Sequence, residues 1–246
     1  MQITLPYVQT FCGVAAPAGK EDQIVEFRLL FHGTVRPTGN KGHPMDTHAI
    51  RRVFHPQLRL LWATRPSLGQ LAQQWSLKLA YAPPTDYLRR IAREWHPDDK
   101  EERVRLGFEA MGKNWARAGF NCVPLATDDL DATCSLDVLL LRPGPSMTRH
   151  ILSQGDIDGQ LKAIIDALRI PDSGNETGGA APESDETPFF CLLENDRLVS
   201  EVRVMADELL SLPGKPTVGP NDAFVVVHAK VGHRHHRTFD NWLGSL

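Results

Sequence analysis

Short strand patterns alternate with longer helical patterns along the chain, and this order constrains the fold more than any other feature. Residues 24–32 place Val25, Phe27, Leu29 and Phe31 on one face and polar side chains on the other, which is typical of a half-buried strand. The same criteria predict further strands at 135–142, 197–205 and 223–231, and helices at 46–62, 67–80, 85–95, 101–118 and 159–169. Interleaved elements of both kinds predict an α/β fold.

The chain length of 246 residues fits one large domain, or one core domain with an insertion. Residues 172–188 hold five acidic residues, no basic residue, and several glycines and serines. A stretch of this composition buries too little apolar surface to offset the entropy of ordering it. We therefore expect residues 172–188 to form a disordered acidic loop.

A positively charged stretch interrupts a chain whose formal net charge is −3. Residues 32–70 carry six basic residues against one acidic residue, Asp46. Two interpretations stay open: a surface that follows a nucleic-acid backbone, or an ordinary solvated face.

Three further features bear on location. No apolar run approaches the roughly 18 residues that a membrane-spanning helix needs. The first basic residue is Lys20, so the pattern of a secretory signal is not seen. The four cysteines form no C-x-x-C pair, which is typical of reduced thiols. We expect a cytoplasmic protein that does not cross a membrane.

The segment 153–170 carries the most informative group of polar residues. Its apolar residues recur at helical spacing, and Asp158 stands where a helix N-cap belongs. Lys162 follows one turn later, and Asp156 lies two residues before Asp158. Two carboxylates that enter a helix in this way can converge on one point, with the lysine beside them.

A third carboxylate follows downstream, where Glu194, Asn195 and Asp196 interrupt an apolar run. If the two halves of 189–204 pair as a hairpin, Asp196 lies at the mouth of a strand, beside the first two aspartates. Three carboxylates and a lysine suit Mg²⁺-assisted cleavage of phosphodiesters, because Mg²⁺ prefers oxygen ligands and an ammonium group stabilises added negative charge. The alternative is that Asp158 only caps a helix and Asp196 only forms a turn.

The run Asp156-Ile-Asp158-Gly-Gln-Leu-Lys162, followed after three intervening residues by Asp166-Ala-Leu, resembles the signature of RusA-type Holliday-junction resolvases. The run Asn195-Asp196-Arg197-Leu198-Val199 is similar to that family's second block, an acidic pair that leads into a strand. Two positions depart from the family pattern: Gly159 stands where the family usually has Asn, and Asn195 replaces the first acid of the pair, with Glu194 beside it.

This resemblance implies an α/β fold of the α+β type, with a small mixed sheet flanked by helices. It implies a single RusA-like nuclease domain over 1–246, in which about 46–120 is a helical insertion beyond the family core. Such a domain cuts branched DNA such as a four-way junction in recombination or repair. It implies Mg²⁺ as cofactor, with Mn²⁺ as the alternative ion. It also implies that Asp156, Asp158 and Asp196 bind the metal and that Lys162 is the catalytic lysine. We expect DNA to contact four arginines: Arg51, Arg52, Arg142 and Arg149. The departures at Gly159 and Asn195 leave a non-catalytic nucleic-acid-binding or scaffold protein as the alternative.

The resemblance further implies a homodimer. Nine apolar residues of the 46–80 region are candidates for its interface: Ile50, Val53, Phe54, Leu58, Leu60, Leu61, Trp62, Leu68 and Leu71. The alternative is that these residues pack the helices onto their own domain, because an amphipathic helix buries one face in either case.

Overall fold

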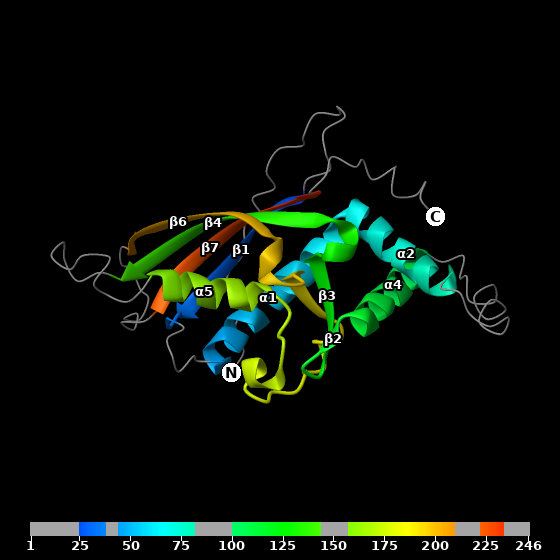
Figure 1. Ribbon diagram of the computed structural model, residues 1–246, viewed down its shortest axis with the longest axis horizontal. Coiled ribbons are helices and arrows are strands. Elements are labelled where there is room, and N and C mark those ends of the chain that lie inside the picture. Colours follow the sequence, from blue (N-terminus) through cyan, green and yellow to red (C-terminus); the bar gives the residue numbers. More distant parts are fainter. Residues whose placement is uncertain (1–24, 38–43, 82–99, 144–156, 210–221, 234–246) are drawn as a thin grey trace, which may run out of the picture.

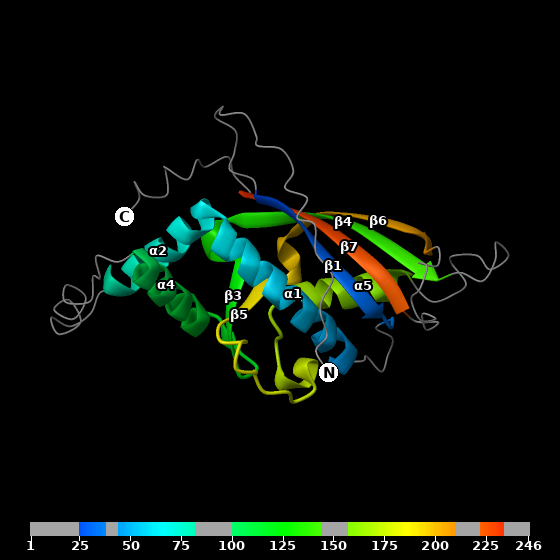
Figure 2. The same ribbon diagram turned by 180° about the vertical axis from the view of Figure 1, so that it is seen from behind.

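The computed structural model describes residues 25–37, 44–81, 100–143, 157–209 and 222–233. Its strands are β1 (Val25–Thr34), β2 (Ala116–Arg117), β3 (Phe120–Ala126), β4 (Ala132–Pro143), β5 (Phe189–Leu193), β6 (Val199–Leu209) and β7 (Asp222–His233). Its helices are α1 (Pro44–Thr64), α2 (Pro66–Tyr81), α4 (Lys100–Asn114) and α5 (Ile157–Leu168), with short 3₁₀ helices η1 (Asp128–Leu130), η3 (Gly174–Thr177) and η4 (Asp196–Leu198). The fold is mixed α and β, as the sequence predicts, and Figures 1 and 2 show it from opposite sides.

The larger sheet has four strands in the order β1-β7-β4-β6. Strand β7 is antiparallel to both β1 and β4, and β6 is parallel to β4. Strands β1, β4 and β6 therefore run in the same direction and end at the same edge of the sheet. We call this side of the sheet, which is formed by the ends of the three strands, the α5 edge, because α5 begins there.

Alternation along the strands gives this sheet one buried face. Leu29, Leu136 and Val227 point into the core, whereas their neighbours in sequence are more exposed. Figures 1 and 2 show α1 and α5 on the buried face, and no described helix covers the other face. Among the described residues, the outer face of the sheet is therefore not covered by a helix.

The smaller sheet has three strands in the order β2-β3-β5, with β3 and β5 parallel. All side chains of β5 are buried, and so are nearly all of those of β3. The sequence pattern does not predict β3, and it suggests a hairpin over 189–204 in which 189–193 is one half. The hairpin prediction is wrong, because β5 pairs with β3 while β6 joins the larger sheet.

The other predicted elements correspond to observed ones with small shifts at their ends. The exception is the helix predicted at 101–118, because α4 ends at Asn114 and the chain turns into β2. The helix predicted at 85–95 lies outside the described residues. None of the helices in the described part of the chain is long and apolar enough to cross a membrane.

Residues 172–188 are not a disordered loop in this structure. They contain η3, and Thr177 and Glu186 are buried. Glu183 and Glu186 form ion pairs with Arg52 of α1, at 2.8 and 2.9 Å. Composition alone misled the prediction, because the basic partners of these acids lie far away in the sequence.

The apolar residues of the 46–80 region pack within their own chain. Seven of the nine candidate interface residues are buried there: Ile50, Phe54, Leu58, Leu61, Trp62, Leu68 and Leu71. Only Val53 and Leu60 are exposed, at 41% and 63%. The predicted dimer interface is therefore wrong, and the alternative, packing onto the same domain, is correct.

The contact between α2 and α4 depends on a glycine. A Cβ atom on Gly107 of α4 would lie 1.8 Å from the backbone oxygen of Ala72 in α2. We expect Gly107→Ala to lower the free energy of unfolding by about 1–3 kcal/mol or more, because the two helices must move apart. Denaturant unfolding followed by circular dichroism measures this change.

Gly69→Ala in α2 is the matched control, because no atom lies within 4 Å of its added methyl group. This variant should be as stable as the wild type or more stable, by up to about 1 kcal/mol, since alanine favours a helix. Equal stability of the two variants would contradict the close packing at Gly107.

Candidate functional site

The start of α5 is anchored at the α5 edge of the larger sheet. Gln160 of α5 is buried, and its Nε2 donates a hydrogen bond of 3.2 Å to the backbone oxygen of Val35. Val35 directly follows β1, whose end lies at this edge. Asp158, two residues before Gln160, therefore lies near the edge where β1, β4 and β6 end, and Figure 1 shows the start of α5 there.

Asp158 and Lys162 share the exposed side of α5. Both side chains are exposed and stand one helical turn apart. The opposite side of the helix is buried through Ala163, Ile164 and Ala167. This apolar face holds the helix in place, so the carboxylate and the ammonium group face solvent from a fixed support.

Asp196 lies across the sheet from the α5 edge, at the ends where β4 and β6 begin. It is the first residue of η4, directly before β6 begins, and the start of β6 pairs with the start of β4 through Val199 and Cys134. On the other side, Leu193 pairs with Arg169, just beyond the end of α5. The length of α5 thus separates Asp196 from Asp158, by on the order of 15 Å at 1.5 Å per residue.

The three-carboxylate site predicted from Asp156, Asp158 and Asp196 is therefore wrong in its third member. The cause is that 189–204 does not form the hairpin that would have brought Asp196 back. Asp156 lies outside the described residues. Within the described ranges, no three His, Cys, Asp or Glu side chains are grouped closely enough to hold a metal ion.

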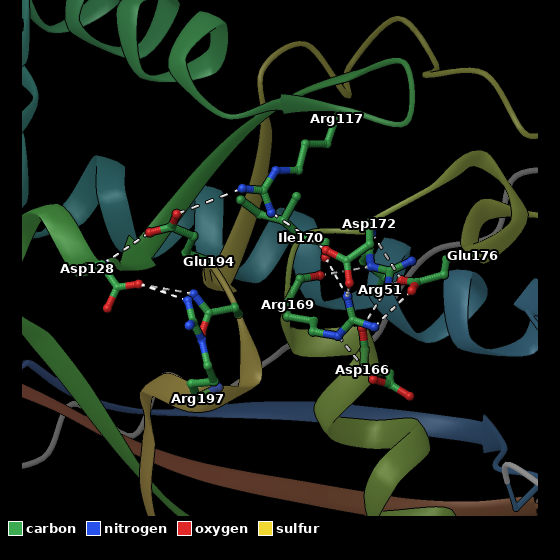
Figure 3. Close-up of polar contacts among 11 residues, drawn as sticks. Arg51, Arg117, Asp128, Asp166, Arg169, Ile170, Asp172, Glu176, Glu194 and Arg197 are labelled. Atoms are coloured by element: carbon green, nitrogen blue, oxygen red, sulfur yellow. Dashed lines mark hydrogen bonds and ion pairs between the residues drawn. The ribbon is translucent and has the colours of Figure 1, made fainter.

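Arg51 is buried in the fold. Its side chain is 1% exposed, and its guanidinium donates to the backbone oxygens of Asp166, at 2.6 Å, and Arg169, at 3.2 Å. These carbonyl groups close the C-terminal end of α5, where the helix dipole is negative. Figure 3 shows Arg51 of α1 at this helix end, beside Glu176. The prediction that Arg51 binds DNA is wrong, because its guanidinium group is buried and donates to the carbonyl groups at the end of α5.

The fold uses Arg52 as well. Besides its ion pairs with Glu183 and Glu186, its Nη2 donates to the backbone oxygen of Ala181, at 3.0 Å. These contacts hold the 181–186 stretch against α1. These contacts engage the guanidinium group of Arg52 within the fold, and its role as a DNA contact stays a prediction.

Arg142, at the end of β4, differs from these two arginines. Its Nε and Nη2 are buried and have no hydrogen-bond partner among the described residues. Burial also lowers the pKa of its guanidinium group. Arg142 lies at the α5 edge, as Asp158 does. The fourth arginine predicted to bind DNA, Arg149, lies outside the described residues.

Sequence reasoning missed two buried histidines on α1, His48 and His55. His55 Nδ1 accepts a hydrogen bond from the backbone N–H of Phe190, at 2.9 Å, so Nε2 carries the proton and donates to the backbone oxygen of Asp185, at 3.1 Å. Burial lowers the pKa of both histidines, that of His48 to about 4. The i, i+3, i+7 spacing of His48, Arg51 and His55 was the available signal, since it puts three polar groups on one helix face.

A cluster of ion pairs joins the end of α5 to the acidic stretch. Arg169 pairs with Asp166 at 3.1 Å, with Asp172 at 2.8 Å and with Glu176 at 2.9 Å (Figure 3). Arg117 of β2 reaches the same Asp172, at 3.6 Å. These acids are therefore engaged in holding the fold together.

Comparison of the chain with protein-family models, with curated proteins and with solved structures finds no significant match.

The buried histidines predict a pH dependence of stability. Because folding lowers the pKa of His48 and His55 from 6.5, the unfolded chain binds more protons below that pH, and stability present at neutral pH is lost as the pH falls. Between pH 7.5 and 5.5, we expect the free energy of unfolding to fall toward a limiting slope of about 1.4 kcal/mol per pH unit from His48, and His55 adds a contribution of the same sign.

Denaturant titrations at several pH values measure this slope. His48→Gln should make it shallower, whereas His32→Gln, which removes an exposed histidine of β1, is the matched control and should leave it unchanged. A wild-type stability that stays flat over this range would contradict the expectation.

The buried guanidinium predicts a second effect on stability. We expect Arg51→Met to lower the free energy of unfolding by about 1.5–3 kcal/mol, because it removes charged hydrogen bonds from buried carbonyl groups. Arg59→Met on the same helix is the matched control. Arg59 is exposed and makes only a 3.5 Å contact with the Asp185 oxygen, so the change should stay within about 0.5 kcal/mol. Equal losses in the two variants would argue against the role of Arg51.

Proposed function

We propose that the protein is a divalent-metal-dependent endonuclease that cleaves phosphodiester bonds in branched DNA, with Asp156, Asp158 and Lys162 at its centre. The observation that carries the proposal is the position of Asp158 and Lys162. The two stand one turn apart on the exposed side of a helix whose other side is buried. The D-x-D-x-x-x-K sequence adds a second carboxylate at Asp156.

The donor set suits Mg²⁺, with Mn²⁺ as the alternative ion. Mg²⁺ keeps several of its waters and is commonly held by one or two carboxylates together with substrate phosphates. Asp156 and Asp158 therefore suffice as protein ligands, and the distant Asp196 is not needed. When bound, such an ion lowers the pKa of an attacking water and balances charge on the phosphate oxygens.

Two positive groups supplement the carboxylates. The Lys162 ammonium group is exposed beside Asp158, where it can stabilise the extra negative charge of the transition state. Arg142 shares the α5 edge and has guanidinium nitrogens without a described partner.

A non-catalytic nucleic-acid-binding or scaffold protein is the second candidate. The separation of Asp196 from Asp158 favours it, because the family pattern uses both residues in one site. Arg51 and Arg52 make contacts within the chain, and this weakens the argument for nucleic-acid binding in both candidates.

Cleavage of a labelled four-way junction in Mg²⁺ separates the two candidates, with duplex and single-stranded DNA as controls. We expect Lys162→Ala to reduce the cleavage rate by roughly 10²–10³-fold, the usual effect of removing a group that stabilises the transition state. Asp158→Asn should abolish cleavage and leave junction binding intact. Asp196→Asn is the matched control and should cleave at the wild-type rate, because it lies at the other edge of the sheet.

Circular dichroism of each variant verifies that it is folded. Junction binding without cleavage, in Mg²⁺ and in Mn²⁺, would favour the scaffold protein. Wild-type cleavage by Lys162→Ala, or a loss of cleavage in Asp196→Asn alone, would overturn the proposed site.

A further inference from the structure

The two edge strands of the larger sheet differ in how they are covered. At the β1 edge, Gln57 of α1 bonds to the backbone of Leu30 with both ends of its amide, at 2.9 and 2.7 Å. At the β6 edge, by contrast, Asp207 accepts a local hydrogen bond from the backbone N–H of its neighbour Glu208, at 2.8 Å. Within the described part of the chain, no further strand pairs with the outer side of β6, so this long strand has one side open for pairing.

The side chains of β6 are also exposed. Met205 is 65% exposed, and Val202 and Val204 are each 37% exposed. Apolar side chains on an unpaired edge strand favour the addition of another strand.

An apolar row crosses the outer face of the sheet and ends at this edge. The pairing registers align Leu30 of β1 with Val226 of β7, Val226 with Leu139 of β4, and Leu139 with Met205 of β6. The two ends of the row are well exposed, with Leu30 at 42% and Met205 at 65%. The apolar surface therefore continues up to the open strand.

We propose that β6 pairs with β6 of a second copy of this chain, antiparallel and about a two-fold axis at Met205. In this register each Arg203, which pairs with Glu201 of its own strand at 2.9 Å, also lies opposite Asp207 of the other copy, so two symmetrical charge clusters form. Met205 lies opposite Met205, which joins the two apolar rows into one stripe across a continuous sheet. The strand thus carries charges that complement a copy of itself.

Neighbouring registers fit less well. An axis at Val204 sets Glu201 against Asp207, and an axis at Arg203 sets two arginines against each other; like charges directly opposite are destabilising. An axis at Val202 matches Glu201 with Arg203, but it pairs only 199–205 and leaves the apolar rows unjoined. The axis at Met205 pairs 201–209.

This inference does not rest on the proposed nuclease function, because it concerns assembly and not cleavage. Sedimentation equilibrium of the full chain at micromolar concentration tests it, with a dimer of the 27.4 kDa chain as the expected species. Asp207→Arg should give a monomer, because it sets two arginines against each other at both symmetrical positions. Arg203→Asp should do the same by opposing two aspartates.

Mixing these two variants in equal amounts is the decisive experiment. In a mixed pair, the position changed by Arg203→Asp in one copy faces the position changed by Asp207→Arg in the other, so opposite charges meet again. The two unchanged residues also face each other, and dimer mass should return. The double variant Arg203→Asp/Asp207→Arg should likewise form dimers. Circular dichroism checks that each variant is folded.

Three results would overturn the proposal. The first is a wild-type chain that stays monomeric up to about 100 µM. The second is a dimer that neither single variant dissociates. The third is single variants that remain monomeric after mixing, which would reject the register centred on Met205. The swap Glu201→Arg/Arg203→Glu is the matched control, since it preserves the dimer only in the register centred on Val202.

Discussion

The buried guanidinium of Arg51 is the interaction on which the arrangement of the central helices depends. A charge removed from water is costly unless it is well hydrogen-bonded. Arg51 meets this requirement by donating to carbonyl groups at the end of α5, where partial negative charge accumulates. The C-terminal end of α5 is thereby tied to α1, and the N-terminal end, with Asp158, extends to the α5 edge of the sheet.

The acidic stretch 172–188 and the basic helix α1 neutralise each other. Arg52 binds Glu183 and Glu186, and His55 holds the adjoining backbone at Asp185. Part of the positive charge of the 32–70 region is thus neutralised by ion pairs within the fold. The charge composition of each segment, taken alone, gave a wrong picture of it. In the fold, the acids of one segment pair with the basic residues of the other.

The position of α5 also decides which residues can act together. The helix has a buried apolar face, and it carries Asp158 and Lys162 toward solvent at one edge of the sheet. Its other end meets β5, which leads to Asp196. A nuclease centre at the first edge therefore has to be built without Asp196. The open strand β6 is a separate feature, which depends on what the sheet leaves uncovered.

Local sequence determined most of the elements. The alternation in β1 and β7 and the 3.6-residue period of α1 and α5 were sufficient to locate these elements, because burial of one face gives a strand or a helix its own period of apolar residues. The helical position of Asp158 and Lys162 followed from the same stripe. The continuous apolar runs of β3 and β5 carried no such signal, since strands buried on both faces do not alternate.

Tertiary structure alone decided the rest. The partner of β5 could not be deduced from 189–204, because a run of apolar residues fits a hairpin and a parallel pair equally well; this choice moved Asp196 away from Asp158. Likewise, a lone arginine such as Arg51 has the same sequence signature on a DNA-binding face and in a core. Only the position of the α5 carbonyl groups, more than a hundred residues further along the chain, shows that its charge belongs inside.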